Sequence, residues 1–555
     1  MCTSHLKQCH GYPCSSASHV QLPSGCPVPQ EELCSICLEV ANIDAQIIRT
    51  EFLLSDLHRK RIITKNKRLN QLHDPLSFIP LEVASQIFAF FVNDSNGSFS
   101  DWPKSRYHNG FNWSPSFFLA SICKGWRQIA LITPELWTSI RVQIYSLSTI
   151  LLQAETLTQC LARSGNRSLA IAIYAENAVA EETNNNFNFS PLFDTLRQCA
   201  SRWRELALRL PTCWYGNFIP NFPYAPRLET LQLRHVPGFE CNDQFNLHET
   251  PCLTSLDISD LLLSQINVHW NNLTIFRAEI VSVDEIFEVL RRATQLLRCR
   301  LGPIMDDTGH FPIPITPVAH SSLKNLHLEF GCTVATMATL FDYIELPSLG
   351  DLSIDCSCPP GGSTVPWRSL RSLFERSRSP LIKFSLLDKR LDGTNILSLL
   401  EVLPTLRDLH LEGGKMLTDY VLEGLGEHTS LKDGTSQFRI FPSRRSLTYK
   451  GECAFSWRTL LDAFYAGWEE ALDVTQPSRP PIATVSTKQP FCFRFLQVRS
   501  GLGEIIYIDA KSASHLARLQ KKFPLEIVDV RYGLDLIKVS LQYHGHDILD
   551  DVTVT

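Results

Sequence analysis

Apolar residues recur in one six-residue pattern through the second half of the chain. Each copy places an apolar residue first, another fourth and a third sixth, with other residues between them. Successive copies begin 20 to 32 residues apart, and most of the gaps are 23 to 27 residues long. The nine copies are WRELAL from Trp203, LETLQL from Leu228, LTSLDI from Leu253, LTIFRA from Leu273, LLRCRL from Leu296, LKNLHL from Leu323, LGDLSI from Leu349, LIKFSL from Leu381 and LRDLHL from Leu406.

This spacing predicts a short strand followed by a return segment in each unit. The fourth and sixth residues of a copy, such as Leu326 and Leu328, lie on one side of a strand and face a core. Helical periodicity over residues 283–297 and 366–378 predicts return helices. One unit cannot bury its own apolar side, whereas stacked units can. Because the period is close to the roughly 20–29 residues of leucine-rich repeats, the sequence predicts an irregular solenoid of parallel strands with return helices or loops over residues 201–413.

Beyond residue 413 the pattern weakens. Residues 493–499, a helical stretch at 512–523 and residues 536–543 indicate degenerate repeats or a terminal cap. Residues 475–490 are rich in proline, which predicts an exposed loop.

Two helical stretches precede the repeats. The first follows Pro80, has Glu82 in its first turn, and repeats apolar residues at Val83, Ile87 and Phe91. A polar insert at about 93–115 separates it from a second amphipathic stretch that includes Leu119. The pattern therefore predicts a small helical module.

The residues of this module resemble a known domain. Ile79-Pro80-Leu81-Glu82-Val83 with Ile87-Phe88 resembles the opening of an F-box. Leu119, Ile122-Cys123, Trp126-Arg127, Pro134 and Leu136-Trp137 resemble its second half in fungal (basidiomycete-type) F-box proteins with C-terminal leucine-rich repeats. The resemblance implies an α + α/β fold, in which a small helical F-box module is followed by the solenoid. It also implies a non-catalytic substrate receptor of an SCF-type ubiquitin ligase, whose partners are a Skp-type adaptor, a cullin scaffold and an unknown protein substrate.

The resemblance also carries over the residues that would bind the adaptor. A second interpretation stays open, since the core of a small helical bundle uses the same residue types. We expect Trp126 and Ile87 to be core, and Pro80 and Leu81 to be interface residues, where binding energy usually concentrates. The full set is Pro80, Leu81, Glu82, Val83, Ile87, Phe88, Leu119, Cys123 and Trp126.

Residues between the apolar positions of each strand are expected to line an open sheet face that binds the substrate. Four acids, Glu279, Glu329, Asp355 and Glu412, directly follow the third apolar residue of their copies. Four acids at equivalent positions suit a basic patch on the substrate, although solvated strand positions are often acidic as well. The alternative function is a leucine-rich-repeat interaction scaffold without ligase association. The candidate substrate contacts are Gln232, Asp257, Glu279, His327, Glu329, Asp355, His410 and Glu412.

The N-terminal region offers two further patterns. An interrupted heptad pattern predicts a coiled coil or a docking helix, and six Lys or Arg within residues 58–68 suit a solvated helical face better than a nuclear signal. Cys34 and Cys37 lack the second close pair of a zinc site, so no metal is predicted. The expected organisation is a disordered tail at 1–36, a helical segment at 37–73, the F-box-like domain at 74–140, a linker with the first strand and helix units at 141–200, repeats at 201–413, and degenerate repeats or a cap at 414–555.

Composition narrows the function classes. The 52 basic and 57 acidic residues leave a net charge of -5, which argues against nucleic acid as a partner. No stretch approaches 18 uninterrupted apolar residues, and the first 30 residues lack an apolar signal region, so we expect neither a membrane span nor secretion. The 18 cysteines are scattered, as reduced core thiols of a cytoplasmic or nuclear protein would be. No catalytic motif, P-loop or cofactor fingerprint is present in the sequence, which favours a protein that is not an enzyme.

Overall fold

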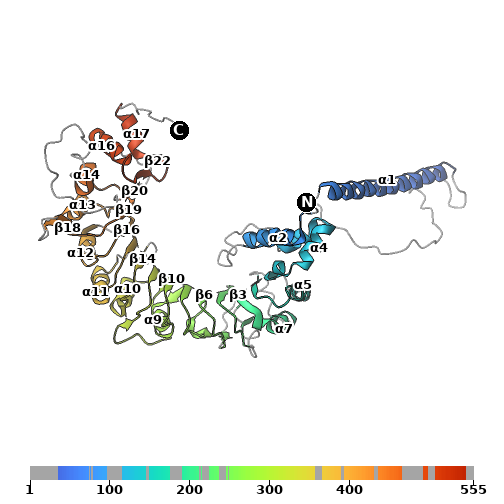
Figure 1. The fold of residues 1–555 in the computed structure, drawn as a ribbon, viewed down its shortest axis with the longest axis horizontal. Helices are drawn as coiled ribbons and strands as arrows, with labels where there is room; N and C mark the ends of the chain where they lie inside the picture. The colour runs from blue at the N-terminus through green and yellow to red at the C-terminus, as the bar shows by residue number, and fades with distance from the viewer. Residues whose placement is uncertain are drawn as a thin grey trace. The chain divides into compact units, whose positions relative to one another are not determined.

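A computed structural model describes most of the chain, and two units can be distinguished within it (Figure 1). The first comprises residues 1–91 and 117–131, and the second comprises residues 92–116 and 132–555. The predicted tail, the polar insert and the Pro-rich loop lie wholly or largely outside the described residues. The described residues are 35–73, 76, 79–96, 115–144, 149–175, 190–211, 214–215, 224–236, 245–247, 249–356, 365–388, 393–430, 436–465, 492–497 and 507–545.

Helices form the described part of the first unit. Pro80 directly precedes the helix α2 (Leu81–Asn96). Glu82 lies in the first turn of α2, where its negative charge interacts favourably with the positive end of the helix dipole. The third and fourth helices are separated only at Cys123, and Arg127 bridges the break because its Nε donates to the carbonyl of Ala120 at 2.8 Å. The helices are α1 (Ser35–His73), α2 (Leu81–Asn96), α3 (Pro115–Ile122) and α4 (Lys124–Ile132).

One long sheet organises the second unit. Its neighbouring strands pair in parallel, except for the final pair β21 and β22. Three further two-stranded ladders are described, β5 (Phe245–Leu247) with β7 (Ile266–Val268), β11 (Val318–Ala319) with β13 (Ile344–Glu345), and β17 (His428–Ser430) with β18 (Ser436–Phe438). The strands of the long sheet, in spatial order, are β1 (Ser139–Ile144), β2 (Leu169–Ala175), β3 (Trp203–Leu210), β4 (Thr230–His235), β6 (Ser255–Ser259), β8 (Ile275–Glu279), β10 (Arg298–Met305), β12 (Asn325–Phe330), β14 (Asp351–Asp355), β15 (Lys383–Leu387), β16 (Asp408–Glu412), β19 (Ser446–Gly451), β20 (Cys492–Gln497), β21 (Leu525–Asp529) and β22 (Leu534–Asp535), with β9 (Val281–Ser282) also pairing with β10.

The nine hexamers of the sequence fall on nine successive strands of this sheet, β3 to β16. Their fourth and sixth residues are buried, as Leu326 and Leu328 on β12 illustrate, while the residues between them are more exposed. The register aligns these positions from strand to strand, so that Leu328 lies between Leu301 and Ile354. The predicted combination of helices with a long parallel sheet is confirmed. The sheet also extends beyond the hexamers, to β1 and β2 before them and to β19–β22 after them.

Return segments contain helices, which lie along one side of the long sheet (Figure 1). The helix α9 begins with a capping box, because Glu285 accepts from the backbone N–H of Ser282 at 3.1 Å. Residues 536–543, within the predicted cap, form a helix, α17. The helices are α5 (Ile150–Arg163), α7 (Ser190–Gln198), α9 (Val283–Arg292), α10 (Val334–Asp342), α11 (Trp367–Ser377), α12 (Ile396–Leu400), α13 (Asp419–Gly426), α14 (Trp457–Tyr465), α16 (Ala510–Gln520) and α17 (Leu536–Tyr543), and the 3-10 turns are η3 (Pro134–Trp137), η6 (Ala200–Arg202), η7 (Leu263–Gln265) and η9 (Gly393–Asn395).

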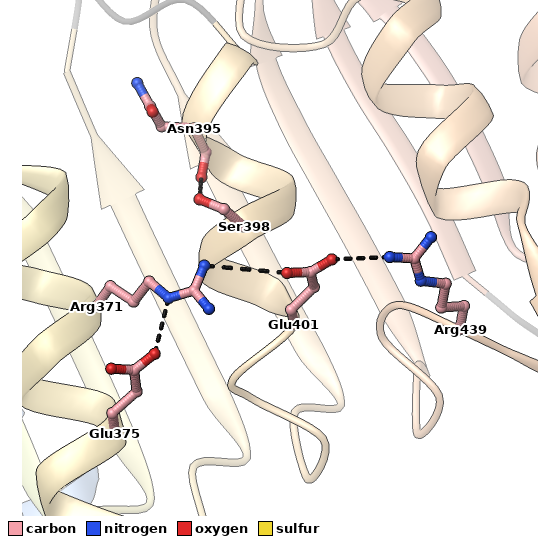
Figure 2. Close-up of polar contacts among 6 residues, drawn as sticks. All are labelled: Arg371, Glu375, Asn395, Ser398, Glu401 and Arg439. Carbon is pink, nitrogen blue, oxygen red and sulfur yellow. Dashed lines mark hydrogen bonds and ion pairs between the residues drawn. The ribbon is translucent and has the colours of Figure 1, made fainter.

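Ion pairs join neighbouring return segments on the helical side of the sheet (Figure 2). The Nε of Arg371 lies 2.8 Å from Oε1 of Glu375, and its Nη1 lies 3.9 Å from Oε2 of Glu401. Glu401 also faces Arg439, with 3.3 Å between Oε1 and Nη2. Such exposed pairs each contribute about 0.2–1 kcal/mol. The buried apolar core therefore supplies far more of the stability than this chain of charges.

Candidate functional site

An uncovered apolar stripe runs along α2 in the first unit. Val83, Ile87, Phe90 and Phe91 recur three, four, seven and eight residues apart, which places them on one side of the helix. Ile87 is 48% exposed and Phe90 is 75% exposed. We call these four residues the α2 stripe. Because contiguous exposed apolar side chains are unusual on a monomer, the stripe is a candidate protein-binding surface.

The helices α3 and α4 add to the exposed apolar surface of this unit and contribute to its core. Phe118 and Ile122 on α3 are exposed. Trp126 on α4 is half-buried and packs against Phe88 of α2, with 5.0 Å between the ring centroids. Its backbone N–H donates to Sγ of Cys123 at 3.4 Å. The ring contact between Phe88 and Trp126 thus joins α2 to α4.

The predicted adaptor residues divide between this core and the surface. Phe88 and Leu119 are buried, and Cys123 and Trp126 are half-buried. The exposed members are Pro80, Leu81, Glu82, Val83 and Ile87.

The expectation that Ile87 belongs to the core is wrong. The buried side of α2 carries Ala84 and Phe88, four residues apart, with exposed fractions of 1% and 2%. Ile87 lies one residue, or about a quarter turn, away from Phe88 and therefore belongs to the exposed stripe. Because the side chain of Ala84 is small, the sequence did not mark it as a core residue, and the buried side of α2 was therefore misplaced.

In the second unit, the outward-pointing strand residues form a polar surface that we call the open sheet face. Strand alternation gives each strand a central outward residue, such as Gln232, Asp257, His327 and His410. Gln232 and Asp257 are register neighbours and are both buried, whereas the two histidines are half-buried. The predicted substrate contacts on these strands thus share one face, at different depths.

Burial sets the protonation of several groups on this face. Desolvation raises the pKa of Asp257, although Arg234, whose Nη2 lies 3.7 Å from Oδ2, acts in the opposite direction. Desolvation likewise lowers the pKa of His327 and of His410. Both imidazoles are therefore neutral near pH 7, where they can donate or accept hydrogen bonds without adding charge.

The four predicted acids do not form a continuous row. On β10, Leu301 is in register with Ala278 of β8 and with Leu328 of β12. The next residue on each strand is Glu279, Gly302 and Glu329, so Gly302 lies between the two acids. Similarly, β15 has Leu387 in register between Asp355 and Glu412. Glu412 is ion-paired with Lys450 on β19. Glu329 and Asp355 are thus the only directly adjacent pair among the four predicted acids.

Sequence reasoning missed a group of arginines on the open sheet face. Arg277 on β8 is in register with Arg300 on β10, and Arg298 lies two residues before Arg300 on the same side of its strand. All three are exposed and line a surface cavity of about 320 Å³, together with Asn325 and His327. The signal was present in the sequence, because these arginines occupy the outward positions of the hexamers LTIFRA and LLRCRL.

A second and larger surface cavity, of about 840 Å³, lies further along the same face. It is lined by charges of both signs, including Asp351, Lys383, Asp408 and Arg445, and by His410.

Several described thiols are poorly suited to chemistry. Burial raises the pKa of Cys160 to about 11 and also raises the pKa of Cys299, which keeps both thiols protonated and weakly nucleophilic. Among the described residues, no group of three or more His, Cys, Asp or Glu side chains is placed to hold a metal ion. The described helices include none that is both long and apolar enough to cross a membrane.

Comparison with known proteins adds little to these observations. No protein-family model matches the chain, and no curated protein matches it. Among solved structures, the chain is similar to the crystal structure of the Rad7 and Elc1 complex in yeast. That match has 14% identity and a TM-score of 0.24, and it covers 73% of this chain and 94% of the other. A likeness this weak carries no argument about function.

Proposed function

We propose that this protein is a non-catalytic substrate receptor of an SCF-type cullin ubiquitin ligase. In this proposal α2, α3 and α4, within the F-box-like domain expected at 74–140, bind a Skp-type adaptor. The strand and helix units of the second unit act as a leucine-rich-repeat solenoid whose open sheet face binds a protein substrate. The proposal rests chiefly on one observation, the exposed α2 stripe, in which Val83 and Ile87 belong to the residues that resemble an F-box opening.

The α2 stripe has the chemistry of a protein interface. Apolar area removed from water contributes about 25 cal/mol per Å², and aromatic side chains each bury roughly 150–250 Å² in packed interfaces. Phe90 and Phe91 supply two such side chains beside Ile87. A partner that covers the stripe gains this burial without displacing Phe88, which already packs within the unit.

The proposed role needs no acid, base or nucleophile from this chain. A receptor raises the effective concentration of substrate lysines near a ubiquitin-charged enzyme that another subunit recruits. The open sheet face, with polar and charged outward residues on successive strands, can hold a protein surface for that purpose. Cytoplasmic or nuclear localisation and the domain boundaries given above stay predictions.

The alternative function is an interaction scaffold that uses the same sheet face without any ligase. A scaffold of this kind would not bind the adaptor, and the α2 stripe would bind another partner. The two functions differ in a single measurable property, which is binding of a Skp-type adaptor.

We expect the full chain to co-purify with a recombinant Skp-type adaptor, because the α2 stripe would be covered in that complex. The measurement is affinity capture of the tagged chain followed by size-exclusion chromatography of the complex. A single co-eluting peak supports the receptor. Failure of the folded wild-type chain to bind the adaptor would reject the ligase role and favour the scaffold.

A further inference from the structure

The helix α1 is long, and its apolar residues are uncovered. It spans 39 residues, and its described side chains are exposed apart from those of Ala41 and Asp56, which are half-buried. A helix in water gains most of its stability by packing an apolar side against another element. Within the described residues, the apolar side chains of α1 lack that packing.

Six of these apolar residues form one regular seam. Together with Thr50, they recur alternately four and three residues apart along the helix, which is the pattern of two helices that pack knobs into holes. The hydroxyl of Thr50 donates to the backbone carbonyl of Gln46 at 2.7 Å, so Thr50 can be covered without losing a hydrogen bond. We call these seven residues the α1 seam. Its apolar members, each 42% to 69% exposed, are Ile36, Val40, Ile43, Ile47, Leu54 and Leu57.

We propose that the α1 seam binds the α1 seam of a second copy of this chain, as an antiparallel two-helix coiled coil. The two seams overlap when Val40 lies opposite Leu57 and Ile43 lies opposite Leu54. At 1.5 Å per residue, the seam rises about 30 Å along the helix axis. Its exposed apolar side chains would be buried over that length without any rearrangement of α2, α3 or α4.

Charges beside the seam favour the antiparallel orientation. In a parallel pair, residues five positions apart on the two helices flank the seam together, which places Glu39 beside Asp44. The same spacing places Lys60 beside Lys65, so both kinds of pair repel. In the antiparallel pair Glu39 instead faces Lys60 of the other helix, which is an attraction, while Asp44 faces Glu51. The parallel pair therefore has two unfavourable kinds of contact, and the antiparallel pair has one of each sign.

The distribution of charge along α1 also suits a second copy of the same helix. Four acids lie within residues 39–56, and six Lys or Arg lie within residues 59–68. A two-fold axis brings each end of one helix toward the opposite end of its copy. The two basic segments then lie at opposite ends of the pair, whereas a parallel pair would hold them side by side at close range.

The test is the mass of the full chain in solution, measured by sedimentation equilibrium without adaptor. The chain has a mass of 62.9 kDa, and we expect a particle of twice that mass at micromolar concentration. Ile47→Asp places a carboxylate within the seam and should weaken the dimer by about 30-fold or more. Since α1 lies outside the helices proposed to bind the adaptor, self-association and adaptor binding can fail separately.

Ile48→Asp is the matched control. Ile48 is the next residue along α1, lies outside the seam and is 67% exposed. The same substitution there should change the dimer affinity by less than about threefold. Both variants should keep the wild-type circular dichroism spectrum in the far ultraviolet.

A charge reversal tests the orientation. Glu39→Lys should weaken an antiparallel dimer by about threefold, because two like charges then face each other. Adding Lys60→Glu to the same chain should restore the affinity. In a parallel dimer Glu39→Lys would remove a repulsion and tighten the association. A monomeric or trimeric wild type, equal affinities of the Ile47→Asp and Ile48→Asp variants, or a tighter dimer with Glu39→Lys would overturn the proposal.

Discussion

Ile87→Asp is expected to weaken binding of a Skp-type adaptor by about 30-fold or more. Ile87 lies in the middle of the α2 stripe and is 48% exposed, so its replacement disturbs the packing within the unit far less than replacement of the buried Phe88 would. In the proposed complex the new carboxylate would be buried against an apolar partner surface without a counter-charge, which is strongly unfavourable. Truncation of a central apolar anchor alone typically costs ~2 kcal/mol, or about 30-fold. The measurement is adaptor affinity by isothermal titration calorimetry.

The same helix offers a matched control. Gln86 is exposed and lies beside Ile87, toward the polar side of α2. Gln86→Asp introduces the same charge one residue away and should change the affinity by less than about threefold, since solvated surface substitutions have small effects. Equal loss of affinity in both variants would indicate a general charge effect and contradict the assignment of the α2 stripe.

Leu328→Ala is expected to lower the free energy of unfolding of the second unit by ~2–5 kcal/mol. Leu328 is 1% exposed, and its strand neighbours in the core are Leu301 and Ile354. Removal of its isobutyl group leaves a cavity that the flanking strands cannot close without breaking their register. The measurement is urea unfolding followed by tryptophan fluorescence.

His327→Ala provides the comparison from the adjacent position. His327 points to the open sheet face and is only half-buried, so its truncation should change the free energy of unfolding by less than about 0.5 kcal/mol. If the two variants were equally destabilised, the alternation of buried and outward residues on β12 would be contradicted.

The strands were predictable from sequence because their signal is local. A strand that packs one side against a core must alternate apolar and polar residues, and nine hexamers repeat this alternation at near-constant spacing. The strands β1 and β2 were not predicted individually. For β1 the signal was present, because burial alternates along Ser139–Ile144 as it does on the later strands. Residues 169–175 of β2 are almost all buried, so that strand lacks the alternation that marked the others.

The α2 stripe and the arginine cavity at β8 and β10 could not be predicted from the sequence in the same way. Several neighbouring residues of α2 are apolar, so periodicity alone could not decide whether Ile87 or Phe88 faces the core. The arginine cavity depends on the register of β8 against β10, which places Arg277 beside Arg300 across two repeats. The sequence showed the outward position of each arginine but not their shared cavity.

In the proposed complex the first unit binds a Skp-type adaptor through α2, α3 and α4, and backbone amide hydrogen exchange tests this binding directly. The full chain is compared with and without a saturating Skp-type adaptor. We expect slower exchange in peptides that cover residues 81–91 and 117–131, with no change over β3–β16. Unchanged exchange in those helices in the presence of bound adaptor, or protection confined to the sheet, would contradict it.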